Sequence, residues 1–201
     1  GFVAAIVAKG LRRRDAPVRV LRVLEPVEVR EGTAVARVEP ADSLEIDFRI
    51  DFPDAAIGTQ QKTLDMANGA FVRELSDSRT FGRLADVEML RASGLARGGS
   101  LDNAIVVDGG QVLNPGGLRH ADEPVRHKML DALGDLALAG APLIGRYTGV
   151  RAGHALTNRL LHALFARPGL TRMDICDEAL ARRLPGMGVR RADLPAVSRA
   201  A

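Results

Sequence analysis

The sequence predicts an α+β fold in which helices cover one face of a β-sheet. Residues 44–52, LEIDFRIDF, alternate apolar and charged side chains, which is typical of a strand with one buried face. Residues 124–139 instead place their apolar side chains on one arc of a helix. Strands and helices are mixed along the chain without the regular strand–helix–strand order of a parallel sheet, so we expect a two-layer domain of sheet and helices.

The first part of the chain predicts one helix followed by strands. Residues 2–13 are apolar and end in a basic run, and we expect a helix there. Residues 16–40 alternate and favour strands, with Glu31-Gly32 as a hairpin turn. The strand over 44–52 has one apolar face, made of Leu44, Ile46, Phe48, Ile50 and Phe52.

The middle of the chain predicts short elements. Residues 69–76 and 84–93 have helical patterns, and Gly94 ends the second one. Residues 103–108 and 111–114 predict a hairpin around the intervening Gly-Gly pair.

The longest predicted helix follows this hairpin. It has Pro124 in its first turn and ends at Gly140. Residues 141–150 predict a strand, and residues 153–166 predict a helix that ends at an Arg-Pro-Gly sequence. The polar, arginine-rich tail contains one further expected helix, at 172–183.

Composition narrows the functional class. The 201 residues are 46% hydrophobic and 26% charged, as in an ordinary globular protein, and the apolar runs stay well short of the ~18 residues of a membrane span. Only 3% of residues are aromatic and there is no Trp, so no nucleic-acid-binding surface is expected. A single cysteine, Cys176, excludes a disulfide framework and a cysteine-rich zinc site within one chain. No secretory signal is recognised, and we expect a cytoplasmic monomer.

A stripe of three polar side chains is the most informative local pattern. His127, Asp131 and Asp135 are spaced four residues apart, so they stack about one helical turn apart. They lie at the rim of the apolar arc, where a site is both dry and reachable. A His and an Asp in this arrangement can share a metal ion, but a catalytic zinc usually takes about three protein ligands. The alternative is a solvated helix flank with an ordinary His–Asp pair.

His154 is the second candidate, because it opens the helix over 153–166. The alternative for His154 is a capping or surface residue. The glycine-rich Arg97–Ser100 stretch lacks the Lys-Ser/Thr ending of a phosphate-binding P-loop.

Three segments carry a resemblance to a known family. They are SRTFG with GLARGGSLDNAIVVD within 78–108, VLN with VRHKMLDALGDL within 112–136, and IG with GHALTNRLLHAL within 144–164. In this order and spacing, from about residue 2 to 166, the chain resembles the UDP-3-O-acyl-N-acetylglucosamine deacetylases (LpxC) of lipid A synthesis. The resemblance implies zinc-dependent removal of an acetyl group from a UDP-linked acylated glucosamine.

The resemblance also implies a domain organisation. Family members are similar two-domain proteins, each domain a small sheet with a helix layer, with zinc between the domains. We expect residues 1–15 to be the end of the first domain, 16–168 the second domain, and 169–201 a polar tail. In the family the first domain supplies a zinc-binding His and an adjacent general-base Glu. This chain has no Glu-His pair, so the missing domain is expected to supply both groups, and the chain alone is expected to be inactive.

Catalytic roles carry over by position. His127 and Asp131 match two of the three zinc ligands. His154 matches the His that stabilises the oxyanion and protonates the leaving amine, and Asp135 matches its carboxylate partner. Thr80 matches the Thr that hydrogen-bonds the oxyanion.

Substrate contacts carry over in the same way. Lys128 matches a substrate-contacting Lys, Arg151 stands where a Lys is common, and Phe81 is expected beside the substrate. Asp47 and Phe48 are expected at the uridine end. The expected lining of the acyl-chain passage is Leu84, Val87, Ala96, Ala104 and Val106. Two other functions stay open: a non-catalytic remnant that binds UDP-sugar or a partner protein, and an unrelated metal-free anion-binding module.

Overall fold

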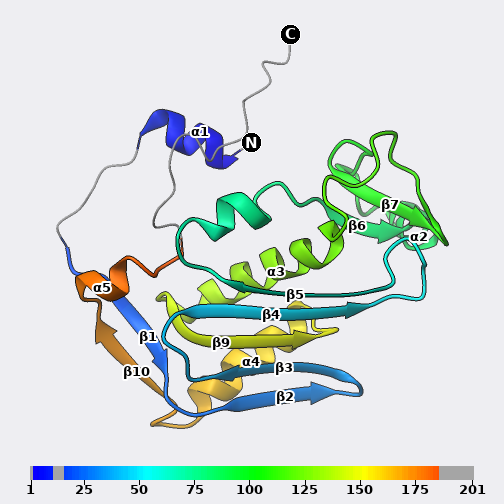
Figure 1. The fold of residues 1–201 in the computed structure, drawn as a ribbon. Coiled ribbons are helices and arrows are strands. Elements are labelled where there is room, and N and C mark those ends of the chain that lie inside the picture. Colours follow the sequence, from blue (N-terminus) through cyan, green and yellow to red (C-terminus); the bar gives the residue numbers. More distant parts are fainter. Residues whose placement is uncertain (1, 11–15, 186–201) are drawn as a thin grey trace.

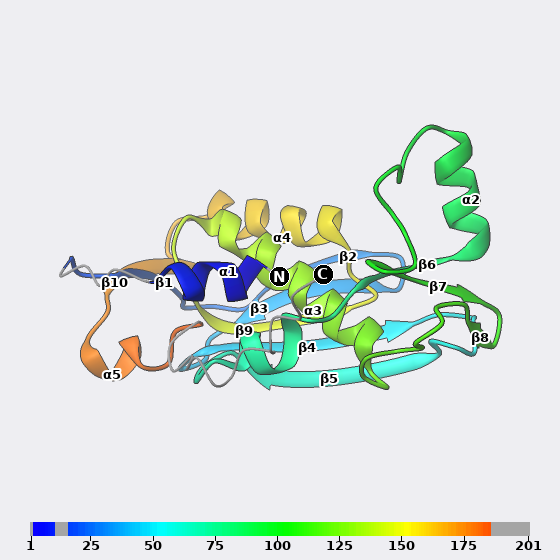
Figure 2. The same cartoon turned by 90° about the horizontal axis from the view of Figure 1, so that it is seen from above.

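A computed structural model describes residues 2–10 and 16–185 and confirms the α+β fold. Its main feature is a seven-stranded mixed sheet with two long helices on one face (Figures 1 and 2). The strands of this sheet are β1 (Arg19–Val23), β2 (Val27–Glu31), β3 (Ala34–Glu39), β4 (Leu44–Asp51), β5 (Thr59–Asp65), β9 (Leu143–Val150) and β10 (Thr171–Ile175).

Strand β9 is the centre of the sheet. It pairs antiparallel with β3 and parallel with β4 over the same residues, so these two neighbours lie on its opposite edges. Its first residues, Leu143 and Ile144, pair in parallel with β1. The turn expected at Glu31-Gly32 is present, because β2 and β3 form a hairpin in which Glu31 faces Ala34.

The helix layer consists of α3 (Glu123–Leu136) and α4 (His154–Ala166), which pack on one another (Figure 2). Helix α3 lies over β4 and β5, and α4 lies over β2 and β3. The expected apolar face of β4 is buried against this layer at Leu44, Ile46, Phe48 and Ile50. Helix α3 continues as a short 3₁₀ turn (Ala137–Ala139) and ends at Gly140, which adopts the left-handed conformation expected at a helix end.

A smaller sheet stands at one end of the molecule (Figure 2). It contains β6 (Thr80–Arg83), β7 (Ala104–Asp108) and β8 (Gln111–Val112), and β7 and β8 form the expected hairpin. Helix α2 (Leu84–Ala92) follows β6 directly and has no fully buried residue. The segment expected as a helix at 69–76 forms one π-helical turn over Phe71–Leu75.

The two ends of the described chain differ from the sequence expectation. The first helix, α1, covers Phe2–Lys9, and residues 11–13 of its expected range lie outside the described residues. The helix expected at 172–183 is wrong for its first part, where β10 pairs antiparallel with β1. Only Glu178–Ala181 forms a helix, α5. The alternation of Thr171, Met173 and Ile175 with Arg172 and Asp174 suits an edge strand.

Within the described ranges, the structure contains no helix that combines the length and the apolar character needed to cross a bilayer.

Candidate metal and catalytic site

Helix α3 presents the expected polar stripe toward α4 and the strand β6. The side chains of His127, Asp131 and Asp135 are 15%, 20% and 17% exposed. They lie beside the buried positions Val125, Met129, Ala132 and Leu136. The stripe is therefore at the rim of the core, as its spacing predicts.

The imidazole of His127 is held on both sides. Its Nδ1 lies 3.4 Å from the carbonyl oxygen of Ser78, and its Nε2 lies 3.4 Å from Oδ1 of Asp131. The ring of Phe81 meets it edge to face, with 6.2 Å between ring centroids. Burial lowers the pKa of His127, and the Asp131 carboxylate offsets this only in part. The imidazole is consequently neutral near pH 7, the form that can bind a metal ion.

The donor geometry at His127 and Asp131 fits zinc. Two atoms bound to one tetrahedral zinc ion at about 2.0–2.1 Å lie about 3.3–3.4 Å apart. The separation between His127 Nε2 and Asp131 Oδ1 is 3.4 Å. A second oxygen of Asp131 accepts a hydrogen bond from Lys128 Nζ at 2.9 Å, which orients the carboxylate. Among residues 2–10 and 16–185 no cluster of three or more metal-binding side chains occurs.

The expected pairing of Asp135 with His154 is confirmed. His154 Nδ1 lies 2.9 Å and 3.0 Å from the two carboxylate oxygens of Asp135, although 19 positions separate the residues. Packing of α3 against α4 brings the end of one helix stripe to the first residue of the next helix. The other ring nitrogen, Nε2, lies 3.9 Å from Asp131. The His154 side chain is 67% exposed.

A cavity of about 370 Å³, lined by both charged and apolar side chains, opens beside this cluster. It includes His127 and Asp131, together with the expected substrate contacts Lys128 and Arg151. The rest of its wall comes from the end of β4, from β6, from the first turn of α2 and from the turn after β9: Ile50, Asp51, Phe52, Thr80, Phe81, Gly82, Arg83, Asp86, Ala152 and Gly153.

A second, mostly apolar cavity of about 630 Å³ lies between α2 and the small sheet. All five residues expected to line an acyl passage are in its wall: Leu84, Val87, Ala96, Ala104 and Val106. Thr80, Phe81 and Gly82 line both cavities, so the two spaces adjoin beside His127.

The structure speaks against one of the two expected uridine contacts, Phe48. Phe48 is 1% exposed and packs in the core against Tyr147, with ring centroids 6.3 Å apart, so its ring is closed to a ligand. Asp47 accepts a hydrogen bond from Gln61 at 3.1 Å and lines neither cavity. Asp51 and Phe52 occupy the cavity wall instead. The signal was present in the sequence, because Ile-Asp-Phe occurs twice, at 46–48 and at 50–52.

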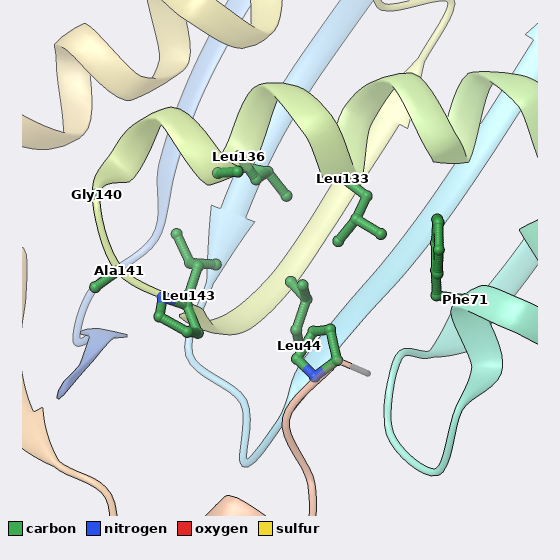
Figure 3. A pocket seen from close by; sticks show the side chains of 10 residues that line it. Leu44, Phe71, Leu133, Leu136, Gly140, Ala141 and Leu143 are labelled. Atoms are coloured by element: carbon green, nitrogen blue, oxygen red, sulfur yellow. The ribbon is translucent and has the colours of Figure 1, made fainter. Parts of the chain in front are cut away.

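A third cavity, of about 540 Å³, lies at the other end of α3 and contains none of the expected site residues (Figure 3). The side chains in its wall are all apolar. The residues around it are Leu44, Phe71, Leu133, Leu136, Ala137, Gly140, Ala141, Pro142, Leu143 and Pro185. It holds no side chain for acid–base or metal chemistry, so the candidate site is the cluster of His127, Asp131, Asp135 and His154.

Comparison with known proteins gives one consistent result. Residues 1–166 match the family described as LpxC, UDP-3-O-acyl N-acetylglycosamine deacetylase. The chain is 52% identical over 180 residues to the UDP-3-O-acyl-N-acetylglucosamine deacetylase of Phenylobacterium zucineum (strain HLK1), covering 90% of this chain and 61% of that protein. It is 46% identical over 172 residues to the enzyme of the same name from Anaeromyxobacter sp. (strain Fw109-5), covering 86% and 57%. The chain thus spans somewhat more than half the length of the curated relatives it matches.

Proposed function

Because this chain belongs to the UDP-3-O-acyl-N-acetylglucosamine deacetylase family, we propose that it forms the second half of a zinc-dependent amidase active site. The substrate is a UDP-linked acylated glucosamine, and the reaction removes its acetyl group in the cytoplasm. This chain offers His127 and Asp131 as zinc donors, and in the family the remaining zinc ligand and the general base belong to the first domain.

One observation carries the proposal. Two cavities of different chemistry, one lined by charged side chains of both signs and one mostly apolar, meet at Thr80–Gly82 beside His127. A substrate with a charged nucleotide at one end and an acyl chain at the other needs this arrangement, with the scissile amide at the junction. Lys128 and Arg151 supply positive charge for the diphosphate, and Asp51 and Phe52 take the place of Asp47 and Phe48 beside the nucleotide.

The chemistry divides between the zinc ion and the side chains. Zinc supplies Lewis acidity, which lowers the pKa of water toward about 7 and polarises an amide carbonyl. Thr80 donates a hydrogen bond to the oxygen that becomes negative during attack. His154, held by Asp135, stabilises the same charge and acts as the general acid toward the leaving amine.

The test uses the full-length protein and two histidine variants. His127→Ala is expected to abolish both zinc binding and amine release from the UDP-linked substrate, because a metal ligand is lost. His162→Ala is the control, because His162 lies on the exposed side of α4 and lines neither cavity. Zinc-independent activity, or wild-type zinc content in His127→Ala, would contradict the proposal. Binding of UDP-sugar with no turnover would favour the non-catalytic alternative.

A further inference from the structure

A buried carboxylate lies next to the candidate site but outside both site cavities. Glu123, in the first turn of α3, is 0% exposed. It accepts hydrogen bonds from the backbone N–H and Nε of Arg79, at 3.0 and 2.9 Å, and from Arg79 Nη2 at 3.0 Å. A fourth bond comes from the backbone N–H of Arg119 at 2.6 Å. Burial alone would raise the pKa of Glu123, but these bonds outweigh it and hold the pKa below its usual value.

Stability alone does not account for the buried Arg79–Glu123 ion pair. A buried ion pair is often no better for stability than well-packed apolar residues of the same volume, because both charges lose their hydration. What the pair adds is a defined geometry. Its four hydrogen bonds hold the backbone N–H of Arg79 as well as its guanidinium, so the chain at residue 79 is fixed in place and not merely covered.

The fixed residue lies between two functional neighbours. Ser78, immediately before it, turns its carbonyl oxygen toward Nδ1 of His127 at 3.4 Å. Thr80, immediately after it, begins β6 and lines both cavities. The Ser78 N–H is itself bonded to the carbonyl of Leu75 at 3.0 Å, so Ser78 is restrained from both sides.

His127 has an acceptor beside each ring nitrogen: the Ser78 carbonyl lies 3.4 Å from Nδ1, and the Asp131 carboxylate lies 3.4 Å from Nε2. A carbonyl oxygen only accepts hydrogen bonds, so it favours the tautomer with the proton on Nδ1. That tautomer leaves the Nε2 lone pair free and directed toward Asp131. Partners of this kind orient metal-binding histidines and typically change metal affinity by about 10–100-fold.

We propose that Glu123 and Arg79 are positioning residues for the metal site: their buried pair holds the Ser78 carbonyl against Nδ1 of His127 and thereby selects the metal-binding tautomer. The expected change in zinc affinity rests on the proposed function. The effect of the pair on the tautomer does not depend on zinc.

The chain contains a matched control for the pair. Arg126 of α3 is also a nearly buried arginine, 13% exposed against 10% for Arg79. It bonds Asp122 at 2.6 Å and Glu74 at 2.7 Å, so it too joins α3 to the preceding segment. It makes no bond to residues 78–80. Arg79→Lys and Arg126→Lys each keep the positive charge and lose the forked geometry of arginine.

The first measurement is made on the metal-free, full-length protein. Proton–nitrogen NMR of ¹⁵N-histidine-labelled protein at about pH 8, where imidazole is neutral, reports the tautomer of His127. His127→Gln identifies its signals by their loss. We expect the Nδ1-protonated form in the wild type and in Arg126→Lys, and a mixture of tautomers in Arg79→Lys.

The second measurement is the Kd for zinc, by competition with a chelator, together with the Tm of each variant. We expect Arg79→Lys to weaken zinc binding at least about tenfold, and Arg126→Lys to change it less than about twofold at a similar loss of Tm. Should Arg79→Lys fail to fold, Glu123→Gln takes its place, because the amide keeps one acceptor oxygen for the Arg79 N–H groups.

The outcomes separate the two proposals. If wild-type protein binds no zinc, the proposed function fails and the tautomer measurement alone decides the inference. If Arg79→Lys and Arg126→Lys have the same His127 tautomer and the same zinc affinity, the pair is a structural contact only and the inference is overturned.

Discussion

Replacing Asp135 by Asn is expected to lower turnover strongly and to change stability little. The Asp135–His154 pair has good geometry, 2.9 and 3.0 Å to the two oxygens, but His154 is 67% exposed. Solvent-exposed pairs of this kind contribute only about 0.2–1 kcal/mol to stability. Asn preserves the shape of the side chain and removes its charge, so the free energy of unfolding is expected to fall by less than about 1 kcal/mol.

Turnover is expected to fall much further. Loss of the carboxylate leaves the imidazole of His154 without its orienting negative charge, and a positioned acid or base contributes about 10²–10⁴-fold. We expect a decrease of about 10²-fold in kcat, equivalent to about 2.7 kcal/mol of transition-state free energy. KM is expected to stay within about threefold, because the group acts on charge that develops only during the reaction.

The assay is amine release by full-length protein, with urea unfolding measured in parallel. Glu31→Gln is the control, because it breaks another exposed pair on α4, that of Arg159 with Glu31 at 2.7 Å. This control is expected to leave kcat unchanged. A kcat within a few-fold of wild type in Asp135→Asn, or a stability loss above about 2 kcal/mol, would refute the reasoning.

Three further predictions concern the core, the single tyrosine and the apolar cavity. A Cβ added at Gly149 would lie 2.6 Å and 2.8 Å from ring atoms of Phe48, so Gly149→Ala should lower the free energy of unfolding in urea by about 3 kcal/mol. Gly134 lies in helix α3, and a Cβ added there would meet no atom within 4 Å, so Gly134→Ala should raise the free energy of unfolding by about 1 kcal/mol. The same change in stability for both substitutions would contradict the packing argument. Burial raises the pKa of Tyr147 to about 12, above the value of about 10 in the unfolded chain. The contribution of the neutral phenol to stability is therefore complete below pH 10 and is lost as the pH rises toward 12. Phenolate absorbance should therefore appear only on unfolding at pH 11, with Tyr147→Phe as the blank. Val87→Phe should fill the apolar cavity and shift kcat/KM toward substrates with shorter acyl chains; unchanged chain-length preference would remove Val87 from the passage.

Sequence patterns predict the elements that have one buried face. Strand β4 follows from its alternation, and the rim position of His127 follows from helical spacing. Strand β5 (Thr59–Asp65) has no such signal, because it pairs only with β4 and its polar side chains are nowhere fully buried. Strand β10 was expected as a helix, because its charged residues suit either structure and only the pairing with β1 decides between them.

Sequence patterns do not determine contacts between distant segments. The sequence Ile-Asp-Phe occurs twice, at 46–48 and at 50–52, and its spacing places Phe48 and Phe52 on the same face. Strand β4 ends at Asp51, and Asp51 and Phe52 line the cavity there. Nothing in the spacing of Arg79 and Glu123, 44 positions apart, predicts their bond. The resemblance supplies roles for individual residues, but the buried pair beside them is visible only once the chain is folded.

The place of β1 in the sheet determines the order in which the protein can be assembled during synthesis. Strands β2 and β3 can pair early in synthesis, because each has its partner next to it in sequence. Strand β1 precedes them but pairs with β9 at Leu143 and with β10 at Thr171–Ile175. Its apolar residues Val20 and Leu21 therefore remain uncovered until nearly all of the described chain has been translated. A shortened gene that stops at residue 166, where the family match ends, would deprive β1 of β10 permanently and expose one edge of the sheet.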